Sequence, residues 1–407
     1  MDRRTLLAGT AAFGAMPLSH ARAQAANTIK VGVLTDLSGT FRDLNGPNTI
    51  AATRVAIQEF GQRGFNVEMV TADHQNRPDV GVNLARQWFD RDNVDVVTSL
   101  ASSAVALAVS ELAREKNKVA IANSTATSDL TGRSCNANTI QWVYDTYMLA
   151  KVAGLAMVRA GGDTWFFVTA DYAFGHALER DTSNFVRQAG GRVVGSVRTP
   201  FPGTTDFSSF LLQAQASRAK VVALANAGAD TVNSIKQAAE FGLTRRGVKI
   251  ASLLMFITDV HALGLQAAQG LVCANTFYWD ANEQTRGLTR RIRAIAGGDI
   301  PVAMSHAGDY SGTLHFLKAV ADMGVPAAKA DGRAIVARMK AMPTEDDAFG
   351  RGTIREDGRK MHPAYLYEVK RPEESRYQHD YYKLLETVSA EEAFRPLSEG
   401  GCPLVRS

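Results

Sequence analysis

Residues 29–34 have the sequence IKVGVL, and this short apolar run decides the fold class. A continuous apolar run rich in valine and isoleucine is typical of a strand buried on both faces of a sheet. Residues 47–60 follow with apolar side chains at helical spacing, and Gly61 marks their end. Residues 67–71 form a second apolar run. The order strand, helix, strand predicts a parallel βαβ unit.

The same alternation continues along the chain and then starts again near Tyr144. In the first series we expect helices over residues 79–89 and 104–114 and strands over residues 94–98 and 118–122. In the second we expect helices over residues 146–159, 174–188, 207–217 and 230–241 and strands over residues 165–169, 192–197, 221–224 and 248–253. Two successive series predict an α/β protein with two Rossmann-like lobes, each built on a parallel sheet.

The last part of the chain has a mixed order. It predicts helices over residues 283–295, 303–322 and 332–342 and a strand over residues 364–369. A chain of 407 residues is too long for one core, so these elements must complete the two sheets, and the chain must cross between the lobes more than once. We therefore expect lobe one over residues 27–145 and 277–345, lobe two over residues 146–276 and 346–370, and a tail, 371–407, that packs near the hinge.

The first 25 residues predict an export signal. Arg3 and Arg4 precede an apolar stretch, residues 6–18, and small residues flank two possible cleavage positions before residue 26. The paired arginines fit a twin-arginine signal, and an ordinary secretory signal is the open alternative. Because no cysteine lies near the cleavage positions, we expect no lipid anchor there, and the mature protein is expected in the periplasm.

Composition and motifs exclude several function classes. The chain has 45 basic and 41 acidic residues without a basic run, so no nucleic-acid partner is expected. It lacks the local motifs of serine hydrolases, zinc proteases and phosphate- or dinucleotide-binding enzymes, so we expect a protein that is not an enzyme and needs no cofactor. A nucleophile set of Ser102, Asp171 and His176 is not favoured. Residues 73–76 (DHQN) are interpreted as a polar loop, and no metal site is expected.

Three cysteines remain, of which one pair can form a disulfide in an oxidising compartment. Cys273 lies in an apolar run, residues 270–274, typical of a buried strand. Cys135 and Cys402 lie among glycine, serine, asparagine and proline. Our hypothesis is that these two pair and tie down the tail. The alternative is that all three thiols are free.

The loops at the carboxyl ends of the predicted strands indicate a ligand site. In open parallel sheets a ligand binds outside these ends. Here five such loops, residues 38–41, 101–103, 123–127, 171–174 and 226–230, are polar, small or aromatic. For any one loop, helix capping is the simpler explanation. Because the loops come from both lobes, we expect a cleft to which they contribute Phe41, Ser102, Ser103, Ser124, Thr125, Ala126, Tyr172, Phe174, Asn226 and Asp230.

At this point a family resemblance can be named. The chain resembles the type I periplasmic binding proteins of the leucine/isoleucine/valine-binding group. Segments along the mature chain carry the likeness, namely residues 29–39, 73–79, 171–175, 206–211, 237–242 and 308–311. The resemblance implies two lobes joined by three crossover strands that close on a ligand by hinge motion. It also implies a monomeric receptor that delivers a small molecule to the membrane permease of an ABC importer.

The resemblance also implies roles for several loop residues. In amino-acid-binding members two lobe-one loops hold the ligand carboxylate, at positions that match Ser102, Ser124 and Ala126, and a lobe-two ring covers the ligand, at Phe174 next to Tyr172. The acidic residue that pairs with an ammonium group falls near Phe256, which is apolar, with Asp230 or Asp259 as possible substitutes. The chain is similar to the subgroup that binds aromatic carboxylates such as benzoate or cinnamate derivatives. A branched-chain or other amino acid is the alternative ligand.

Overall fold

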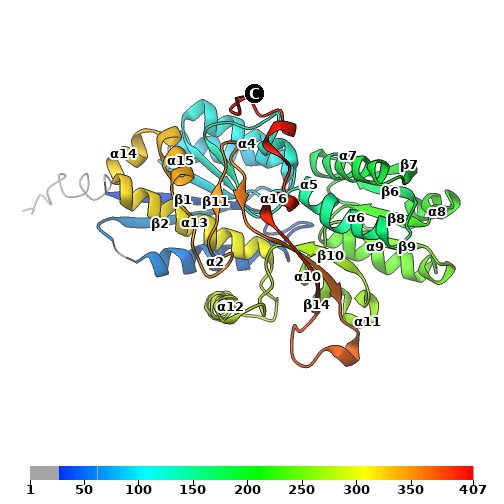
Figure 1. The fold of residues 1–407 in the computed structure, drawn as a ribbon. Coiled ribbons are helices and arrows are strands. Elements are labelled where there is room, and N and C mark those ends of the chain that lie inside the picture. The colour runs from blue at the N-terminus through cyan, green and yellow to red at the C-terminus, as the bar shows by residue number, and fades with distance from the viewer. Residues whose placement is uncertain (1–26, 62, 407) are drawn as a thin grey trace, which may run out of the picture.

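A computed structural model describes residues 27–61 and 63–406 of the chain. The export signal predicted over residues 1–25 lies outside the described residues. Two α/β lobes lie side by side (Figure 1), and each is organised around its own sheet, as the sequence predicted. We call these sheet A in lobe one and sheet B in lobe two. In the described part of the chain, no helix combines the length and the hydropathy that a bilayer crossing requires.

Sheet A is a five-stranded parallel sheet with the strand order β2-β1-β3-β4-β5. Its strands are β1 (Thr28–Thr35), β2 (Asn66–Asp73), β3 (Val96–Ser99), β4 (Val119–Ala122) and β5 (Thr139–Gln141). The helices of this half of the chain are α2 (Gly46–Phe60), α3 (Pro78–Asp90) and α4 (Ser103–Lys116), with the 3-10 turn η1 (Ser128–Thr131). The residues of β3, β4 and β5 are all buried, which explains their apolar runs.

Sheet B is a four-stranded parallel sheet with the order β7-β6-β8-β9. Its strands are β6 (Thr164–Ala170), β7 (Arg192–Thr199), β8 (Val221–Ala225) and β9 (Lys249–Ser252). Its helical segments are α5 (Thr146–Leu149), a π-helical turn η2 (Ala150–Gly154), α6 (Leu155–Arg159), α7 (Ala173–Gln188), α8 (Ser208–Ala216), α9 (Ala229–Glu240), η3 (Thr244–Arg246), α10 (Ile257–Leu263) and α11 (Leu265–Ala268). The single helix expected over residues 146–159 is thus interrupted by a π-helical turn.

The later helices return to lobe one. They are α12 (Glu283–Ala296), α13 (Met304–Met323), α14 (Val325–Ala330) and α15 (Gly332–Ala341), and α12 and α13 both pack on α2. Gly308 and Gly312 let α13 lie close to the ends of β4 and β5, because a methyl group at these positions would clash with Val143 and Asn123. Asn123 in turn donates a hydrogen bond to Asp309 of α13, 3.0 Å long, which fixes the loop after β4.

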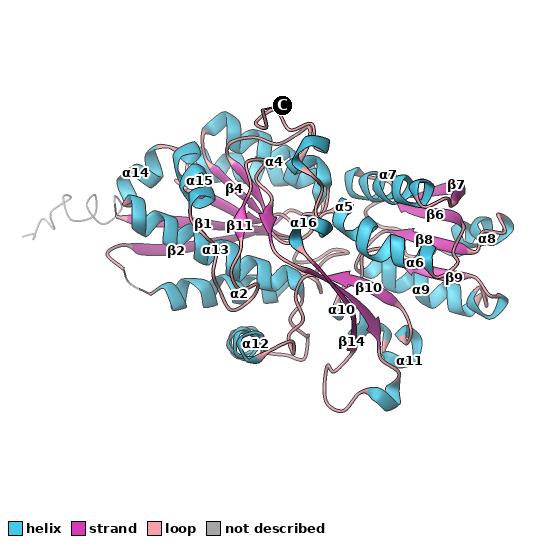
Figure 2. Cartoon of the chain, viewed as in Figure 1, coloured by secondary structure: helices cyan, strands magenta, loops and turns pink. Residues whose placement is uncertain are grey.

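A third, antiparallel sheet connects the lobes, and we call it the hinge sheet. It has the order β10-β13-β14 and consists of β10 (Val272–Asn275), β13 (Ala364–Val369) and β14 (Tyr382–Val388). Figure 2 shows these strands below the junction of the lobes. The short elements near the end are β11 (Thr353–Ile354), β12 (Lys360–Met361), η4 (Pro372–Glu374), α16 (Ala390–Ala393) and η5 (Leu397–Glu399).

Two details differ from the expected domain limits. Residues 346–361 were assigned to lobe two, but β11 packs on α15 and Arg359 forms a bridge with Gln141 of β5, so this segment extends lobe one. The tail also contains a strand that the sequence did not predict, because β14 pairs with β13 along its whole length. The structure joins Cys135 to Cys402 in a disulfide, with 5.6 Å between the Cα atoms, and leaves Cys273 buried and unpaired.

Candidate functional site

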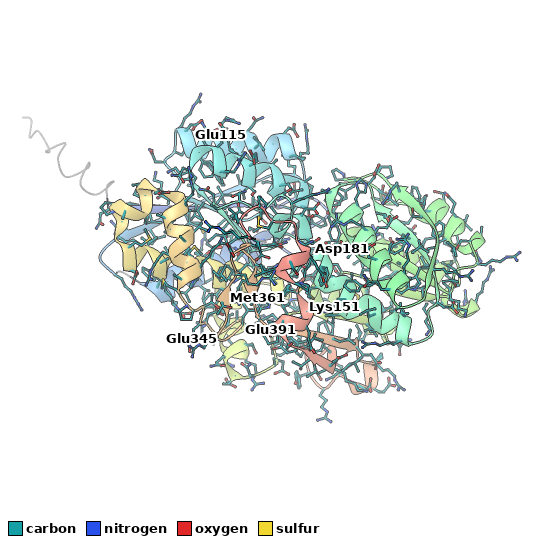
Figure 3. The ribbon with its side chains drawn as sticks, turned by 45° about the horizontal axis from the view of Figure 1, so that its top comes forward. Glu115, Lys151, Asp181, Glu345, Met361 and Glu391 are labelled. Atoms are coloured by element: carbon teal, nitrogen blue, oxygen red, sulfur yellow. A yellow bond between two sulfur atoms is a disulfide. The ribbon has the colours of Figure 1, made fainter. Side chains whose placement is uncertain are left out.

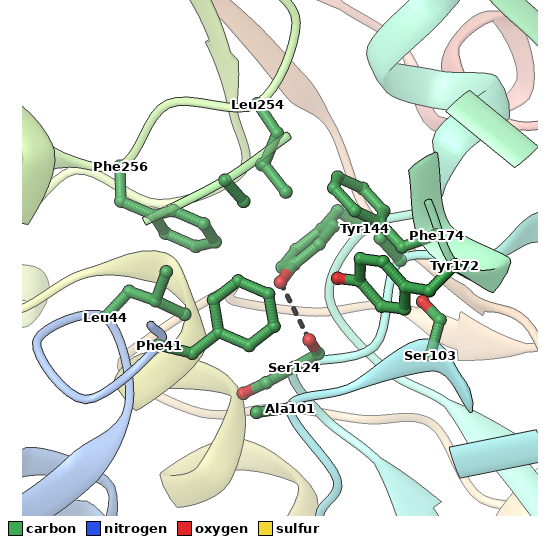
Figure 4. A pocket seen from close by; sticks show the side chains of 12 residues that line it. Phe41, Leu44, Ala101, Ser103, Ser124, Tyr144, Tyr172, Phe174, Leu254 and Phe256 are labelled. Atoms are coloured by element: carbon green, nitrogen blue, oxygen red, sulfur yellow. Dashed lines mark hydrogen bonds between the residues drawn. The ribbon is translucent and has the colours of Figure 1, made fainter. Parts of the chain in front are cut away.

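A cavity lies between the two lobes at the carboxyl ends of their strands (Figure 4). Lobe one supplies the loops after β1, β3, β4 and β5, and lobe two supplies the loops after β6, β8 and β9. The lining residues are Phe41, Leu44, Ala101, Ser103, Ser124, Ala126, Tyr144, Tyr172, Phe174, Ala227, Leu254 and Phe256. Five of them carry aromatic rings and none carries a charge, so the lining favours a flat apolar molecule.

The cavity is narrow in the conformation described. Its volume of about 10 Å³ is close to the room that one water molecule needs. Small-molecule sites commonly offer ~300–1,000 Å³. A ligand can therefore enter only when the lobes or the lining rings move apart.

The loop that carries Phe41 is fixed by a buried carboxylate. Asp36 accepts hydrogen bonds from the backbone N–H groups of Gly39 (2.7 Å) and Phe41 (2.8 Å), and Asn76 donates a further one from its amide. His74 is fully buried and accepts a hydrogen bond from the N–H of Asn76. The DHQN segment thus supports the cleft loop, which agrees with its interpretation as a polar loop.

Aromatic contacts connect the lobes across the cavity. The rings of Phe41 in lobe one and Phe201 in lobe two stack with centroids 5.5 Å apart, and Phe201 stacks on Tyr172 at 4.0 Å. Tyr144 meets Phe256 edge to face at 5.7 Å. Stacked and edge-on ring pairs are favourable, and the members that line the cavity are Phe41, Tyr144, Tyr172 and Phe256.

Hydroxyl groups at the lobe-one wall differ in whether they have partners. The Oγ atoms of Ser102 and Ser124 are buried without a hydrogen-bond partner among the described residues, and only Ser124 lines the cavity. Ser103 accepts the N–H of Thr127, 3.1 Å away, and Thr125 donates to the carbonyl of Leu100. A buried hydroxyl without a partner is costly, so Ser124 is well suited to donate to a ligand.

The first turn of α4 adds a second polar feature to this wall. The helix begins at Ser103, which lines the cavity, and the N–H groups of a first turn have no partner within their helix. Together with the positive end of the helix dipole, they favour an anion at this end of the cavity.

Three predicted polar residues of lobe two lie outside the lining. Asn226 is engaged by Thr231 and Ser234, which gives it a structural role. The carboxylate of Asp259 accepts the N–H of Phe256, 2.8 Å away, and so caps α10, while burial raises its pKa to about 7. Asp230 is also buried, its Oδ2 has no partner among the described residues, and burial raises its pKa to about 7.

Asp230 lies close enough to the cavity to affect a lining residue. Burial raises the pKa of Tyr172 well above its usual range, and the charge of Asp230 raises it further. Among the acidic residues considered at the sequence level, Asp230 is therefore the one that remains available to a ligand at the cleft.

The lining includes residues that the sequence did not single out, namely Leu44, Ala101, Tyr144, Ala227 and Leu254. Ala101 and Ala227 lie in loops that were proposed, but alanine carries no signal of its own. Tyr144 lies just before the first helix of lobe two, and its hydroxyl donates to the carbonyl of Ser124, 2.8 Å away. Its position after a strand was the available signal, but the short strand β5 was not predicted.

Contacts outside the cavity also join the lobes. The N–H of Ala229 donates to the carbonyl of Thr40, 3.1 Å away. Ser128 of lobe one donates to Asp181 of α7, 2.7 Å away, and Figure 3 labels Asp181 at the junction of the lobes. Because each contact pairs a lobe-one group with a lobe-two group, opening the cleft requires breaking them.

Gly228 controls how closely the two lobes approach. Its φ is 61°, and a Cβ there would lie 2.5 Å from the carbonyl oxygen of Thr40. We expect Gly228→Ala to disfavour the closed arrangement and to weaken ligand binding by ~10-fold or more, measured by calorimetry. Gly190→Ala is the matched control, because Gly190 has a φ of 83° and open space around it. Equal affinities of the two variants would contradict this role of Gly228.

Comparisons of the sequence and of the structure with known proteins both find binding proteins of the same kind. The family model described as periplasmic binding protein matches residues 28–375. A curated relative named Leu/Ile/Val-binding protein homolog 3, from Brucella melitensis, is 27% identical over 288 aligned residues, and the match covers 67% of this chain and 73% of the relative.

Two solved structures show the same likeness along nearly the whole chain. One, a periplasmic binding protein from Burkholderia mallei, is 43% identical with a TM-score of 0.89 and covers 94% of this chain and 100% of its own. The other, named as a branched-chain amino acid ABC transporter periplasmic ligand-binding protein from Burkholderia xenovorans, is 36% identical with a TM-score of 0.79 and covers 92% and 99%.

Proposed function

This chain belongs to the periplasmic binding protein family, and we propose that it captures an aromatic carboxylate, such as a benzoate or cinnamate derivative, for the permease of an ABC importer. In this function the two lobes close on the ligand, and the closed form is what the permease recognises. The protein acts as a monomer, it binds its ligand without turnover, and it works in the periplasm after export.

The lining of the cavity is the observation that carries the ligand class. Five aromatic rings and no acidic side chain line it. An ammonium group buried among these rings would lack a carboxylate partner, which costs several kcal/mol. The carboxylate of an aromatic acid instead meets the Ser124 hydroxyl and the first turn of α4 at one wall, while the ring of the ligand lies among the aromatic side chains.

An amino acid is the second candidate, and Asp230 is the observation that favours it. Its Oδ2 is buried without a partner among the described residues, beside the wall that Tyr172 forms. An ammonium group that reached Asp230 would satisfy this oxygen. The names of the Brucella and Burkholderia xenovorans relatives also refer to branched-chain amino acids.

A thermal-shift screen of the mature protein separates the two candidates. Ligand carried over from expression is first removed by unfolding and refolding, and the panel contains benzoate, hydroxybenzoates, cinnamate, leucine, valine and phenylalanine. At 100-fold saturation a ligand stabilises the fold by about 2.7 kcal/mol, which raises the melting temperature measurably. A rise with the aromatic acids alone supports the proposal. A rise with leucine or valine alone contradicts it and favours the amino-acid function.

Replacing Ser124 by alanine tests whether this residue donates a hydrogen bond to the ligand carboxylate. We expect Ser124→Ala to weaken binding of the ligand identified in the screen by about 1–3 kcal/mol, because a hydrogen bond to a charged group is lost. Ser110→Ala is the control, since the Ser110 hydroxyl is buried within lobe one against Thr139 and Asn136. Titration calorimetry of both variants gives the comparison. An unchanged affinity in Ser124→Ala would place the ligand carboxylate elsewhere.

A further inference from the structure

A cluster of two histidines and one aspartate lies outside the cleft. His261, Asp299 and His379 each direct one possible ligand atom into the same small region, and these atoms all lie within 4.8 Å of one another. His261 belongs to α10, Asp299 follows α12, and His379 precedes β14. Asp299 lies 38 residues after His261 and 80 residues before His379, so no local sequence motif indicated this cluster.

The environment of His379 suggests a ligand rather than a structural side chain. Its Nε2 is buried without a hydrogen-bond partner among the described residues, and it faces Oδ1 of Asp299 at 3.4 Å. The residue is only 3% exposed. An imidazole nitrogen that is buried without a hydrogen bond and lies 3.4 Å from a carboxylate oxygen is placed as a metal ligand would be.

The backbone around His379 is held in an unusual conformation. Its φ is 63°, which is uncommon for a residue other than glycine. The carbonyl of His379 accepts the indole N–H of Trp279, 2.9 Å away, and this bond keeps the residue in place. The ring of His379 lies edge-on to that of His261, with centroids 5.1 Å apart.

His261 is oriented by its second ring nitrogen. Its Nδ1 is hydrogen bonded to the hydroxyl of Tyr381, 2.9 Å away, and the two rings stack. Metal-binding histidines typically have such a partner on the nitrogen that does not bind the metal, because it fixes the tautomer and the ring plane. Nε2 of His261 is then the nitrogen that faces a metal.

Asp299 provides the charged ligand, and its side chain is exposed enough to change its rotamer. Its side chain is 58% exposed, so it can rotate toward the two imidazoles. Ligand atoms around a tetrahedral zinc ion lie about 3.3 Å apart, given bonds of about 2.0 Å, so a modest rotation closes the cluster. Gln378 donates to Oδ1 of Asp299, and Arg293 does so at 3.4 Å. These bonds hold the carboxylate beside the imidazoles, with Oδ1 as the oxygen that faces Nε2 of His379.

We propose that His261, Asp299 and His379 form a binding site for one zinc ion, with water as the remaining ligand. Two imidazoles and a carboxylate are a ligand set that zinc accepts, whereas magnesium and calcium prefer oxygen ligands. α12 packs on α2 of lobe one, α10 belongs to lobe two, and His379 lies next to the hinge sheet. A bound ion would therefore connect lobe one, lobe two and the hinge.

Titration calorimetry with zinc chloride on the untagged mature protein tests the site, with cobalt absorption as a second readout. We expect one ion per chain, bound in the micromolar range, and visible bands typical of cobalt with low coordination number. His379→Asn should weaken zinc binding at least 10-fold, and asparagine tolerates the φ of this position. Asp299→Asn, at an exposed position, should also weaken binding and decides the matter if His379→Asn does not fold.

His176→Ala is the matched control, because His176 and Asp171 form an exposed imidazole–carboxylate pair elsewhere, with 2.8 Å between Nε2 and Oδ1. This variant should bind zinc like the wild type. Absence of stoichiometric zinc binding by the wild type would overturn the proposal. Wild-type affinity in both His379→Asn and Asp299→Asn, or loss of binding in His176→Ala, would overturn it as well.

Discussion

Replacing Cys135 and Cys402 together by serine should lower the free energy of unfolding by about 2–5 kcal/mol. The disulfide joins residues 267 positions apart, so it removes a large amount of conformational entropy from the unfolded chain. It also anchors the tail, whose Phe394 is fully buried and whose Arg395 donates to the carbonyl of Ser128, 2.8 Å away. Denaturant unfolding followed by circular dichroism measures the difference.

A reducing agent provides the control for this prediction. Reduction should destabilise the wild type by a similar amount and leave the double variant unchanged, because Cys273 takes part in no disulfide. If the oxidised wild type, the reduced wild type and the double variant unfold at the same denaturant concentration, the disulfide does not contribute to stability.

The sequence predicted most of the two parallel sheets, because their strands and helices carry strong local patterns. The expected helix over residues 79–89 and the observed α3, Pro78–Asp90, agree within one residue at each end. β5, Thr139–Gln141, escaped prediction because three residues are too few to show a period. β14 was not predicted because its five central residues are exposed, and its sequence YKLLETV does not alternate regularly between apolar and polar.

For the candidate site, the sequence predicted which loops meet but not which side chains face the cavity. Parallel strands end at one edge of a sheet, so the five loops could be brought together by topology alone. Whether Ser102 or Ser124 lines the cavity depends on the path of each loop, which hydrogen bonds of distant partners set. Asn123, for example, is tied to Asp309, 186 residues away. The local sequence pattern does not indicate such contacts between residues that are far apart in the chain.

Because such distant contacts cannot be seen in the sequence, the sequence could not show which acidic residue is available to a ligand. Asp230 and Asp259 both follow a strand of lobe two, and both lie in the first turn of a helix. Only the structure shows that Asp259 is used by the N–H of Phe256, while Oδ2 of Asp230 has no partner among the described residues. A substitution of Asp230 therefore tests whether its carboxylate contributes to stability and to ligand binding.

We expect Asp230→Asn to stabilise the ligand-free protein above pH 7 by about 1–3 kcal/mol. Burial raises the pKa of Asp230 to about 7, whereas an unfolded aspartate titrates near 4. As the pH rises from about 4 to 7, the unfolded chain loses this proton first, so the wild type loses stability over that interval. A shift of about three units corresponds to at most about 4 kcal/mol, and loss of the favourable charge at the start of α9 reduces the gain.

Melting temperatures of wild type and Asp230→Asn at pH 4.5 and pH 8 measure this effect. At the lower pH the aspartate is largely protonated in the fold, so the two proteins should differ little there. A variant that is less stable than the wild type at pH 8 would mean that the Asp230 carboxylate has a stabilising partner in the fold.

The same variant separates the two ligand classes, because the two ligands make opposite demands on Asp230. An aromatic acid brings a second negative charge into the cleft, so it should bind Asp230→Asn at least as tightly as it binds the wild type. An amino acid would need the ionised carboxylate as the partner of its ammonium group, and truncating one partner of a buried charge pair typically costs about 2–5 kcal/mol. The stability gain and the affinity change are separate measurements, so loss of binding in a stabilised variant would identify Asp230 as the ammonium partner and exclude an aromatic acid as the natural ligand.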